Sequence, residues 1–171
     1  MAIQCKRCET DEDFAKISLF LLEHKHDLHP SFRTMDVVSL VYSYMTEGNI
    51  VYVVDETGKV VGVSAYYHGT HEQEFRDKEV AFMDIAVSDR AHRGTRLFIK
   101  GLSFMVSQIK ENLPEVREIR LAALSENEYI CKLYAKFARP AYKREGAIGE
   151  ETIFSTRLEE LEAMITRLDK V

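Results

Sequence analysis

The chain has 171 residues, the size of one domain, and 46% of them are hydrophobic, enough to build a sizeable core. Its 23 Lys and Arg residues against 28 Asp and Glu residues give a net charge of -5 with no basic run, which argues against a general nucleic-acid binder. Apolar stretches such as residues 60–67 are far too short to span a bilayer, and residues 1–8 hold no apolar signal core. We therefore expect a cytoplasmic protein with no membrane partner.

The first third of the chain predicts a strand followed by two helices. Residues 3–8 predict a short strand, and Thr10 is placed to cap a helix with acidic residues in its first turn. A polar stretch over residues 24–31 then interrupts the pattern. A second helix is predicted over residues 34–46, with Gly48 as its stop. The spacing puts Val37, Val38, Val41 and Met45 on its apolar face.

Three strands and a long helix are predicted in the middle of the chain. Residues 50–54, 60–67 and 79–87 are rich in β-branched and aromatic residues, and residues 55–58 supply turn chemistry between the first two. A helix over residues 94–112 follows, because its apolar residues repeat at spacings of three and four and form one stripe.

The last third alternates strand and helix. Residues 118–124 predict a strand, and Ser125-Glu-Asn-Glu128 predicts a capping box that opens a helix. Residues 151–158 predict the last strand, and an amphipathic helix over about residues 158–170 follows it. This order is mixed α/β, and an open sheet with helices on its faces is the natural packing for one domain over residues 1–171.

The three cysteines do not make a disulfide framework. Cys5 and Cys8 form a C-x-x-C pair, but zinc needs about four ligands and no second pair of suitable spacing follows. A redox pair would follow a strand and open a helix, whereas this pair lies in the first predicted strand. We therefore expect reduced, inert thiols, and we expect no metal at the histidines of the loops either.

The stretch from Asp84 to Phe98 joins a predicted strand to a predicted helix. A tight loop of this kind leaves backbone amides without internal partners, and those amides and the helix dipole favour a bound anion such as phosphate. Gly94 lets the backbone come close to a ligand, and Arg93 and Arg96 add charge that can pair with phosphate oxygens. The alternative interpretation is an ordinary loop with solvated arginines.

Two spaced motifs carry a family resemblance. Val87, Arg93 and Gly94 match places in the pattern Val-x-Pro-x-x-Arg-Gly-x-Gly-x-Gly. A second pattern, Asn-x-x-Ala-x-x-Leu-Tyr-x-Lys, is matched by Asn127, Leu133, Tyr134 and Lys136. With these motifs and this order of elements, the sequence resembles the GNAT N-acetyltransferase superfamily, which binds the pyrophosphate of acetyl-CoA at the first pattern.

The resemblance covers about residues 3–158 and implies a mixed, mostly antiparallel twisted sheet flanked by helices on both faces. Only the short C-terminal helix lies outside the usual pattern. The first motif departs from the family at three positions, with Asp89 for proline and with Arg96 and Phe98 for the second and third glycines. The Arg-Gly-x-Arg sequence therefore predicts a variant loop in which Arg96 takes over part of the phosphate contact.

The resemblance also implies acetyl-CoA as the acyl donor, without a metal. A backbone amide of the strand before the loop is the implied donor to the developing oxyanion. The implied cofactor contacts are Ile85, Ala86, Val87, Arg93, Gly94, Thr95, Arg96, Leu97, Phe98 and Asn127.

Catalysis of acetyl transfer to an amine needs a base and an acid. A protonated amine cannot attack a thioester, so a base must remove a proton, and the sulfur leaves more readily when an acid protonates it. In relatives the tyrosine at the position of Tyr134 often serves as the acid, and the alternative is a core tyrosine. Asp84, in the middle of an apolar strand, is the candidate base, and Glu79 is the runner-up. The alternative for Asp84 is a structural or solvent-facing carboxylate.

The acceptor predicted by the resemblance is a primary amine of a small molecule or peptide. In the family the first loop lines the acceptor site, which points to His26, Asp27, His29 and Phe32, and one of Tyr66 and Tyr67 faces the cleft, with Tyr66 preferred here. Two other functions stay open: a non-catalytic CoA-binding or regulatory module, and an acyltransferase that uses a longer acyl-CoA or an acyl carrier protein. We also expect a homodimer through the C-terminal helix or the last strand, unless that helix folds back over its own sheet.

Overall fold

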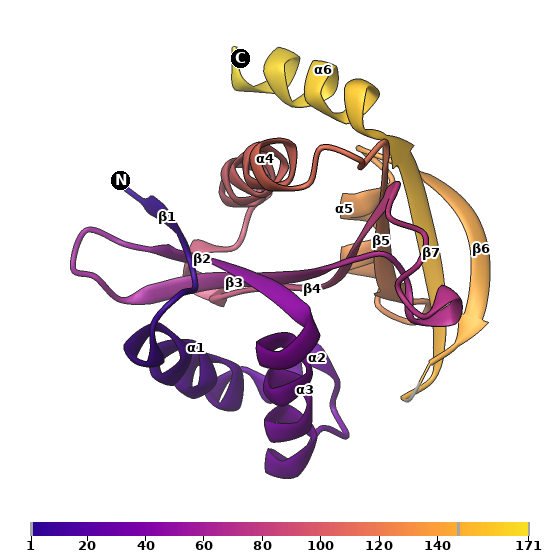
Figure 1. Ribbon diagram of the computed structural model, residues 1–171. Coiled ribbons are helices and arrows are strands. Elements are labelled where there is room, and N and C mark those ends of the chain that lie inside the picture. Colours follow the sequence, from indigo (N-terminus) through magenta and orange to yellow (C-terminus); the bar gives the residue numbers. More distant parts are fainter. Residues whose placement is uncertain (1, 147, 171) are drawn as a thin grey trace. The chain divides into compact units, whose positions relative to one another are not determined.

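The computed structural model describes residues 2–146 and 148–170. Contacts along the chain group it into two compact units, which are described separately: unit 1 is Met1–Tyr66 with Ile85–Gly101, and unit 2 is Tyr67–Asp84 with Leu102–Val171. The strands are arranged in the order β1-β2-β3-β4-β5-β7-β6. The elements in Figure 1 are β1 (Gln4–Arg7), α1 (Asp11–Glu23), α2 (Lys25–Leu28), α3 (Thr34–Glu47), β2 (Gly48–Val54), β3 (Val60–His68), η1 (His71–Gln73), β4 (Val80–Ser88), η2 (Arg90–His92), α4 (Thr95–Asn112), β5 (Glu118–Leu124), α5 (Glu128–Tyr134), β6 (Arg139–Glu145), β7 (Glu150–Arg157) and α6 (Leu158–Asp169).

Unit 1 packs two helices beside the first strands. β1 pairs antiparallel with β2, and α3 lies against both α1 and β2 (Figure 1). Thr10 begins α1 as predicted, because its side chain accepts from the Asp13 amide while the Asp13 carboxylate accepts from the Thr10 amide. The core of this unit is formed by the buried faces of the two helices and by the valines of β2 and β3. The helix residues in that core are Ile17, Phe20, Leu21, Val37, Val41 and Tyr44.

Unit 2 is built around β5. This strand pairs in parallel with β4 from Val80 to Met83 and pairs antiparallel with β7 along its whole length. β6 pairs antiparallel with the other side of β7, α5 contacts β5, and α6 contacts β7. The mixed α/β class, with mostly antiparallel pairs, is therefore confirmed.

Three local expectations were wrong. No element was predicted for residues 139–145, which form β6; the segment carries no alternating pattern, and its seven residues are almost all exposed. The polar stretch after α1 contains the single-turn helix α2. The capping box at Ser125 does not form: Asn127 caps α5 through a bond from the Ile130 amide, and the Ser125 hydroxyl instead meets that of Thr152 at 2.8 Å.

The apolar face of α3 also differs from the prediction. Val37 and Val41 are buried as expected, but Val38 and Met45 are exposed, and Tyr44 is buried in their place. The buried residues 37, 41 and 44 share one face of the helix. The face that packs against α1 and β2 is therefore turned by about one residue from the predicted face.

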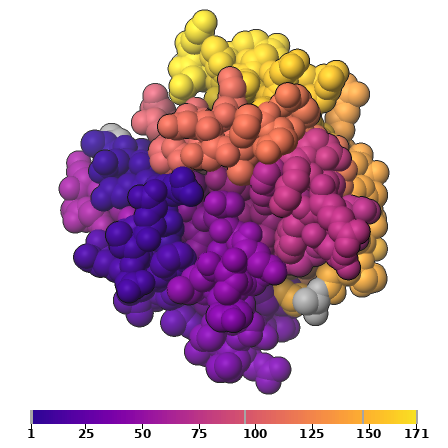
Figure 2. All heavy atoms as spheres, viewed as in Figure 1, coloured from indigo at the N-terminus to yellow at the C-terminus, as the bar shows by residue number. Residues whose placement is uncertain are grey.

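The C-terminal helix α6 folds against its own unit. Leu158, Leu161 and Ile165 are buried, and Lys110 of α4 pairs with Glu162 at 2.9 Å. This is the alternative in which the helix folds back, and α6 (yellow) forms part of the surface in Figure 2. Among the residues described, no helix combines the length and apolar character that crossing a membrane needs.

Candidate functional site

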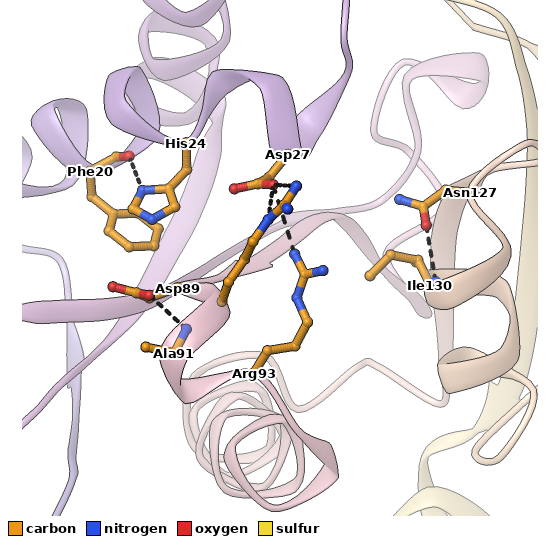
Figure 3. A network of polar contacts seen from close by, with 9 residues as sticks. Phe20, His24, Asp27, Asp89, Ala91, Arg93, Asn127 and Ile130 are labelled. Atoms are coloured by element: carbon orange, nitrogen blue, oxygen red, sulfur yellow. Dashed lines mark hydrogen bonds and ion pairs between the residues drawn. The ribbon is translucent and has the colours of Figure 1, made fainter.

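The turn after β4 is built by Asp89, the residue that stands where proline is usual in the resembling family. Its φ of -56° lies within the range that a proline ring imposes. Its amide donates to the Val61 carbonyl at 2.9 Å, and its carboxylate accepts from the Ala91 amide at 2.9 Å, which shapes the turn η2 (Figure 3). That bond, together with Lys59 at 3.7 Å, holds the pKa of Asp89 below its usual value. Asp89 therefore keeps a φ that proline could also adopt, and it adds two hydrogen bonds that proline cannot make.

The start of α4 offers backbone donors that lie before the first helical hydrogen bond. The Phe98 amide donates to the Gly94 carbonyl at 3.2 Å, so the amides of residues 95–97 precede the first helical bond. A Cβ placed on Gly94 would meet no heavy atom within 4 Å, so there is open space beside this backbone. Arg96 is exposed in the first turn, while the side chain of Thr95 lies outside the described part of the structure. These features fit a phosphate group.

A carboxylate sits between the arginines of this loop. Arg90 donates to Asp27 Oδ1 through Nε at 3.1 Å and Nη2 at 2.9 Å, and Arg93 Nη2 lies 4.0 Å from the same oxygen (Figure 3). The Asp27 side chain is only 13% exposed. The sequence predicted Arg93 at the loop and Asp27 at the acceptor site. The structure instead pairs Asp27 with Arg90, 63 positions away in the chain, and a contact at that separation has no local signal.

The position of α2 depends on the end of α1. The His24 ring stacks on Phe20 with 4.1 Å between ring centroids, and its Nδ1 donates to the Phe20 carbonyl at 2.9 Å. This contact fixes the corner from which α2 presents Asp27. On η2, the buried Nδ1 of His92 has no hydrogen-bond partner among the described residues. Arg90 and His92 were not singled out by sequence reasoning, because their roles depend on the turn geometry.

The strand before the loop is partly open. Ile85 and Ala86 are half-buried although both are apolar, whereas Val87 is buried. The Val87 carbonyl lies 3.7 Å from where a Cβ on Gly62 would be, so β3 and β4 come close at this point. Leu97 and Phe98 are also half-buried. In unit 1 the predicted donor-binding residues of β4, η2 and α4 are consecutive along one strand–turn–helix junction.

Unit 2 holds the two predicted catalytic residues. Tyr134 is 1% exposed and packs edge-on against Phe154, with 5.9 Å between ring centroids. Burial raises the pKa of the Tyr134 hydroxyl well above its usual value, and the carboxylate of Asp84 and the thiol of Cys131 raise it further. The hydroxyl is therefore protonated at neutral pH, and the charge of Asp84 is near enough to influence its pKa. Asp84 itself is half-buried on β4.

Asn127 has a structural role in unit 2. Its carbonyl oxygen accepts from the Ile130 amide at 3.2 Å and so begins α5 (Figure 3). The side-chain amide group of Asn127 can still donate to a ligand. Glu79, the runner-up base, is exposed just before β4.

The predicted acceptor residues differ in exposure. His26 is exposed, while His29 and Phe32 are half-buried and make an edge-on ring contact at 6.3 Å. The His29 Nδ1 accepts from the Ser31 amide at 3.0 Å, which leaves Nε2 to carry the proton of the neutral ring. Tyr66 is buried, and burial raises the pKa of its hydroxyl.

The cysteines are poor nucleophiles. Cys5, Cys8 and Cys131 are free thiols. Burial, with the carboxylates of Asp13 and Glu9, raises the pKa of Cys8 to about 12, and burial raises the pKa of Cys5 as well. Both thiols are thus protonated at neutral pH and inert as nucleophiles. Among the described residues, no group of three or more His, Cys, Asp or Glu side chains is placed to hold a metal ion.

Comparison with solved structures identifies the fold. No family model and no curated protein matches the sequence. A structure of aminoglycoside acetyltransferase AAC(6')-Ib with coenzyme A and kanamycin matches at 17% identity and TM-score 0.72, over 95% of this chain and 98% of that one. Ribosomal-protein-S5-alanine acetyltransferase from Vibrio fischeri matches at 16% identity and TM-score 0.66, over 93% and 94%.

An acetyltransferase of the GNAT family from Streptococcus pneumoniae matches at 12% identity and TM-score 0.65, over 91% of this chain and 99% of that one. The matches extend over nearly the full length of both chains in each comparison. The chain therefore has the fold of the GNAT acetyltransferases, as the sequence motifs indicated.

Proposed function

We propose that the protein is a GNAT-type N-acetyltransferase that moves the acetyl group of acetyl-CoA to a primary amine. The observation that carries the proposal is the junction from β4 to α4. It combines open backbone at Gly94, the amides that lie before the first helical hydrogen bond of α4, and the cations Arg93 and Arg96. Unpaired amides at a helix start and arginines are the groups that proteins use to bind phosphates.

The donor residues follow from this junction. We assign the pyrophosphate of acetyl-CoA to the amides of residues 94–97 and to Arg93 and Arg96. The half-buried Ile85 and Ala86 suit contact with the pantetheine arm, and their backbone amides suit the thioester oxygen. Leu97 and Phe98 add apolar contact with the cofactor. The side-chain amide of Asn127 is assigned as a hydrogen-bond donor to the cofactor.

The reaction needs the acceptor nitrogen as a neutral amine. The amine attacks the thioester carbonyl carbon, the new C–N bond forms, the C–S bond breaks, and the nitrogen gives up a proton to a base. Asp84 is our candidate base, acting directly or through water. We assign Tyr134 as the acid that gives its proton to the departing thiolate, because its hydroxyl is protonated at neutral pH.

The acceptor class is a small-molecule or peptide amine. Enzymes of similar fold include an aminoglycoside acetyltransferase and a ribosomal-protein-S5-alanine acetyltransferase, and both kinds of acceptor offer amines. His26, His29 and Phe32 are the candidate contacts for it. The free thiols are compatible with a cytoplasmic location, where disulfides are rare.

Calorimetric titration with acetyl-CoA, CoA and a longer acyl-CoA tests the donor assignment. We expect acetyl-CoA to bind and Arg93→Ala to weaken binding by about 1.5–3 kcal/mol, the range for a hydrogen bond to a charged group. Lys100→Ala, which removes an exposed cation of α4 outside the loop, is the matched control. Unchanged affinity in Arg93→Ala would overturn the loop assignment.

Turnover is tested by release of free CoA with a panel of primary amines. Release that depends on the amine supports an acetyltransferase. Binding of CoA without release by any amine would favour the non-catalytic module, and preference for the longer acyl-CoA would favour a different acyl donor.

A further inference from the structure

The outer side of α3 carries an apolar stripe that the fold leaves uncovered. Met35 is 68% exposed, Val38 48%, Tyr42 68% and Met45 51%. Four of the large apolar side chains that the structure exposes thus lie on one helix, which forms part of the surface in Figure 2. A surface helix of a monomer normally turns charged residues to this side.

The stripe is uncharged as well as apolar. From Thr34 to Thr46 the helix has Asp36 as its only charged residue, and the Asp36 carboxylate accepts from the Arg33 amide at 2.7 Å at the helix start. The other exposed residues from Thr34 to Thr46 are the hydroxyl residues Thr34, Ser39 and Thr46. Small side chains allow a second helix to come close.

The spacing of the stripe is that of a helix-pairing seam. Positions 35, 38, 42 and 45 are separated by three, four and three residues, the a and d spacing of a heptad. The buried face of α3, at 37, 41 and 44, is separate and already used within unit 1. The helix therefore has one face for its own core and a second face for a partner helix.

The order of residues in the stripe is self-complementary. Met35 and Met45 are equally far from Leu40, and so are Val38 and Tyr42. In an antiparallel pair of identical helices related by a two-fold axis at Leu40, Met35 faces Met45 of the other copy and Val38 faces Tyr42. A two-fold interface requires this match of a surface with itself.

The helix ends favour the antiparallel direction. Arg33 stands at the N-terminal end of α3, where the helix dipole is positive, and Glu47 ends the helix, where the dipole is negative. Both residues are exposed. Antiparallel copies bring opposite charges to the same level, and parallel copies would bring like charges together.

We propose that α3 is the contact surface of a homodimer, with two copies of the helix packed antiparallel about Leu40. Four large side chains that are half to two-thirds exposed offer on the order of 400 Å² of apolar surface per copy, near the upper range of patches on a monomer. Two copies with their polar flanks reach the low end of specific interfaces, the class in which contacts are weak and exchange with the free chains.

Sedimentation equilibrium of the full chain from about 1 to 200 μM tests the proposal, since a weak dimer dissociates within that range. We expect Val38→Glu to weaken dimerisation at least tenfold, because it sets a carboxylate against Tyr42 of the other copy. In the double variant Val38→Glu with Tyr42→Lys, each glutamate faces a lysine of the other copy at two symmetric positions. This variant should regain most of the dimer affinity that Val38→Glu loses. Leu168→Glu, at an exposed apolar position of α6, is the control that leaves the mass unchanged.

Each outcome decides the proposal, provided that circular dichroism shows the variants to be folded. A monomer throughout the concentration range for the unaltered chain overturns it, as does a dimer that Val38→Glu does not weaken. A dimer lost in both the single and the double variant overturns the antiparallel pairing. Loss in Leu168→Glu alone would move the contact to α6.

Discussion

Replacing Asp27 with asparagine is expected to strengthen the binding of CoA. The Asp27 carboxylate accepts two hydrogen bonds from Arg90 and lies 4.0 Å from Arg93, so it holds the position that a phosphate oxygen would compete for. A bound pyrophosphate must share these cations with the carboxylate or displace it. Asparagine keeps the size and an acceptor oxygen, and removes only the charge.

The magnitude follows from distance and exposure. Two unit charges 4 Å apart interact by about 4 kcal/mol at an effective dielectric constant of about 20 and by about 1 kcal/mol in water. The Arg93 side chain is 30% exposed and that of Asp27 is 13% exposed, so the pair is partly screened. We therefore expect a gain of about 1 kcal/mol, close to a fivefold lower Kd for CoA.

Isothermal titration with CoA at low and at about 0.5 M salt measures this effect, because salt screens what remains of it. Glu23→Gln, an exposed carboxylate at the end of α1, controls for the change in net charge. The gain should shrink when Asp27→Asn is combined with Arg93→Ala, because one of the released cations is then gone. Weaker or unchanged binding in Asp27→Asn would refute competition between the carboxylate and the phosphate.

Three further results are expected. Tyr134→Phe should lower kcat by about 10²–10⁴-fold with little change in the KM for acetyl-CoA, and wild-type turnover would reduce Tyr134 to a core residue. Gly69→Ala should lower the free energy of unfolding by about 1–3 kcal/mol, because φ is +98° and the new Cβ would lie 2.8 Å from a backbone carbon, while Gly58→Ala, at φ +84° in open space, should cost less. Asp13→Asn should destabilise the fold by about 1–2 kcal/mol at pH 7, because Asp13 accepts from Tyr52 at 2.7 Å and from two amides, which hold its pKa far below its usual value. Since a lowered carboxyl pKa stabilises the fold fully above its unfolded value near about 4 and progressively less below it, chemical denaturation should show this difference shrinking as the pH falls below that value.

Signals within a few residues predicted most of the elements correctly. Thr10 with Asp13 began α1, Gly48 ended α3, and the repeat of apolar residues placed α4 within one residue of its bounds. The phosphate-loop candidates were also visible, because a strand, a glycine, arginines and a helix follow one another along the chain. Caps, turns and periodicity are local interactions, and the sequence shows them directly.

β6 and the start of α5 were missed where a distant strand decides the outcome. β6 has Pro140 and four charged residues and shows no alternation, and it is a strand because β7 supplies its hydrogen bonds on one side. Ser125 was taken for a cap from its spacing, but Thr152 of β7 holds its hydroxyl, so Asn127 serves instead.

By itself the sequence determined the class of fold, the order of nearly all elements and the residues of the candidate donor loop. Only the tertiary structure decided that Asp27 lies on the loop arginines, that α6 buries its stripe in its own unit, and that α3 packs with 37, 41 and 44 and leaves 38 and 45 in solvent. The reason is physical: two faces of one helix can be equally apolar, and a carboxylate has no preferred partner until the chain brings one to it. Those choices depend on contacts between residues far apart in the sequence, which local propensity does not encode.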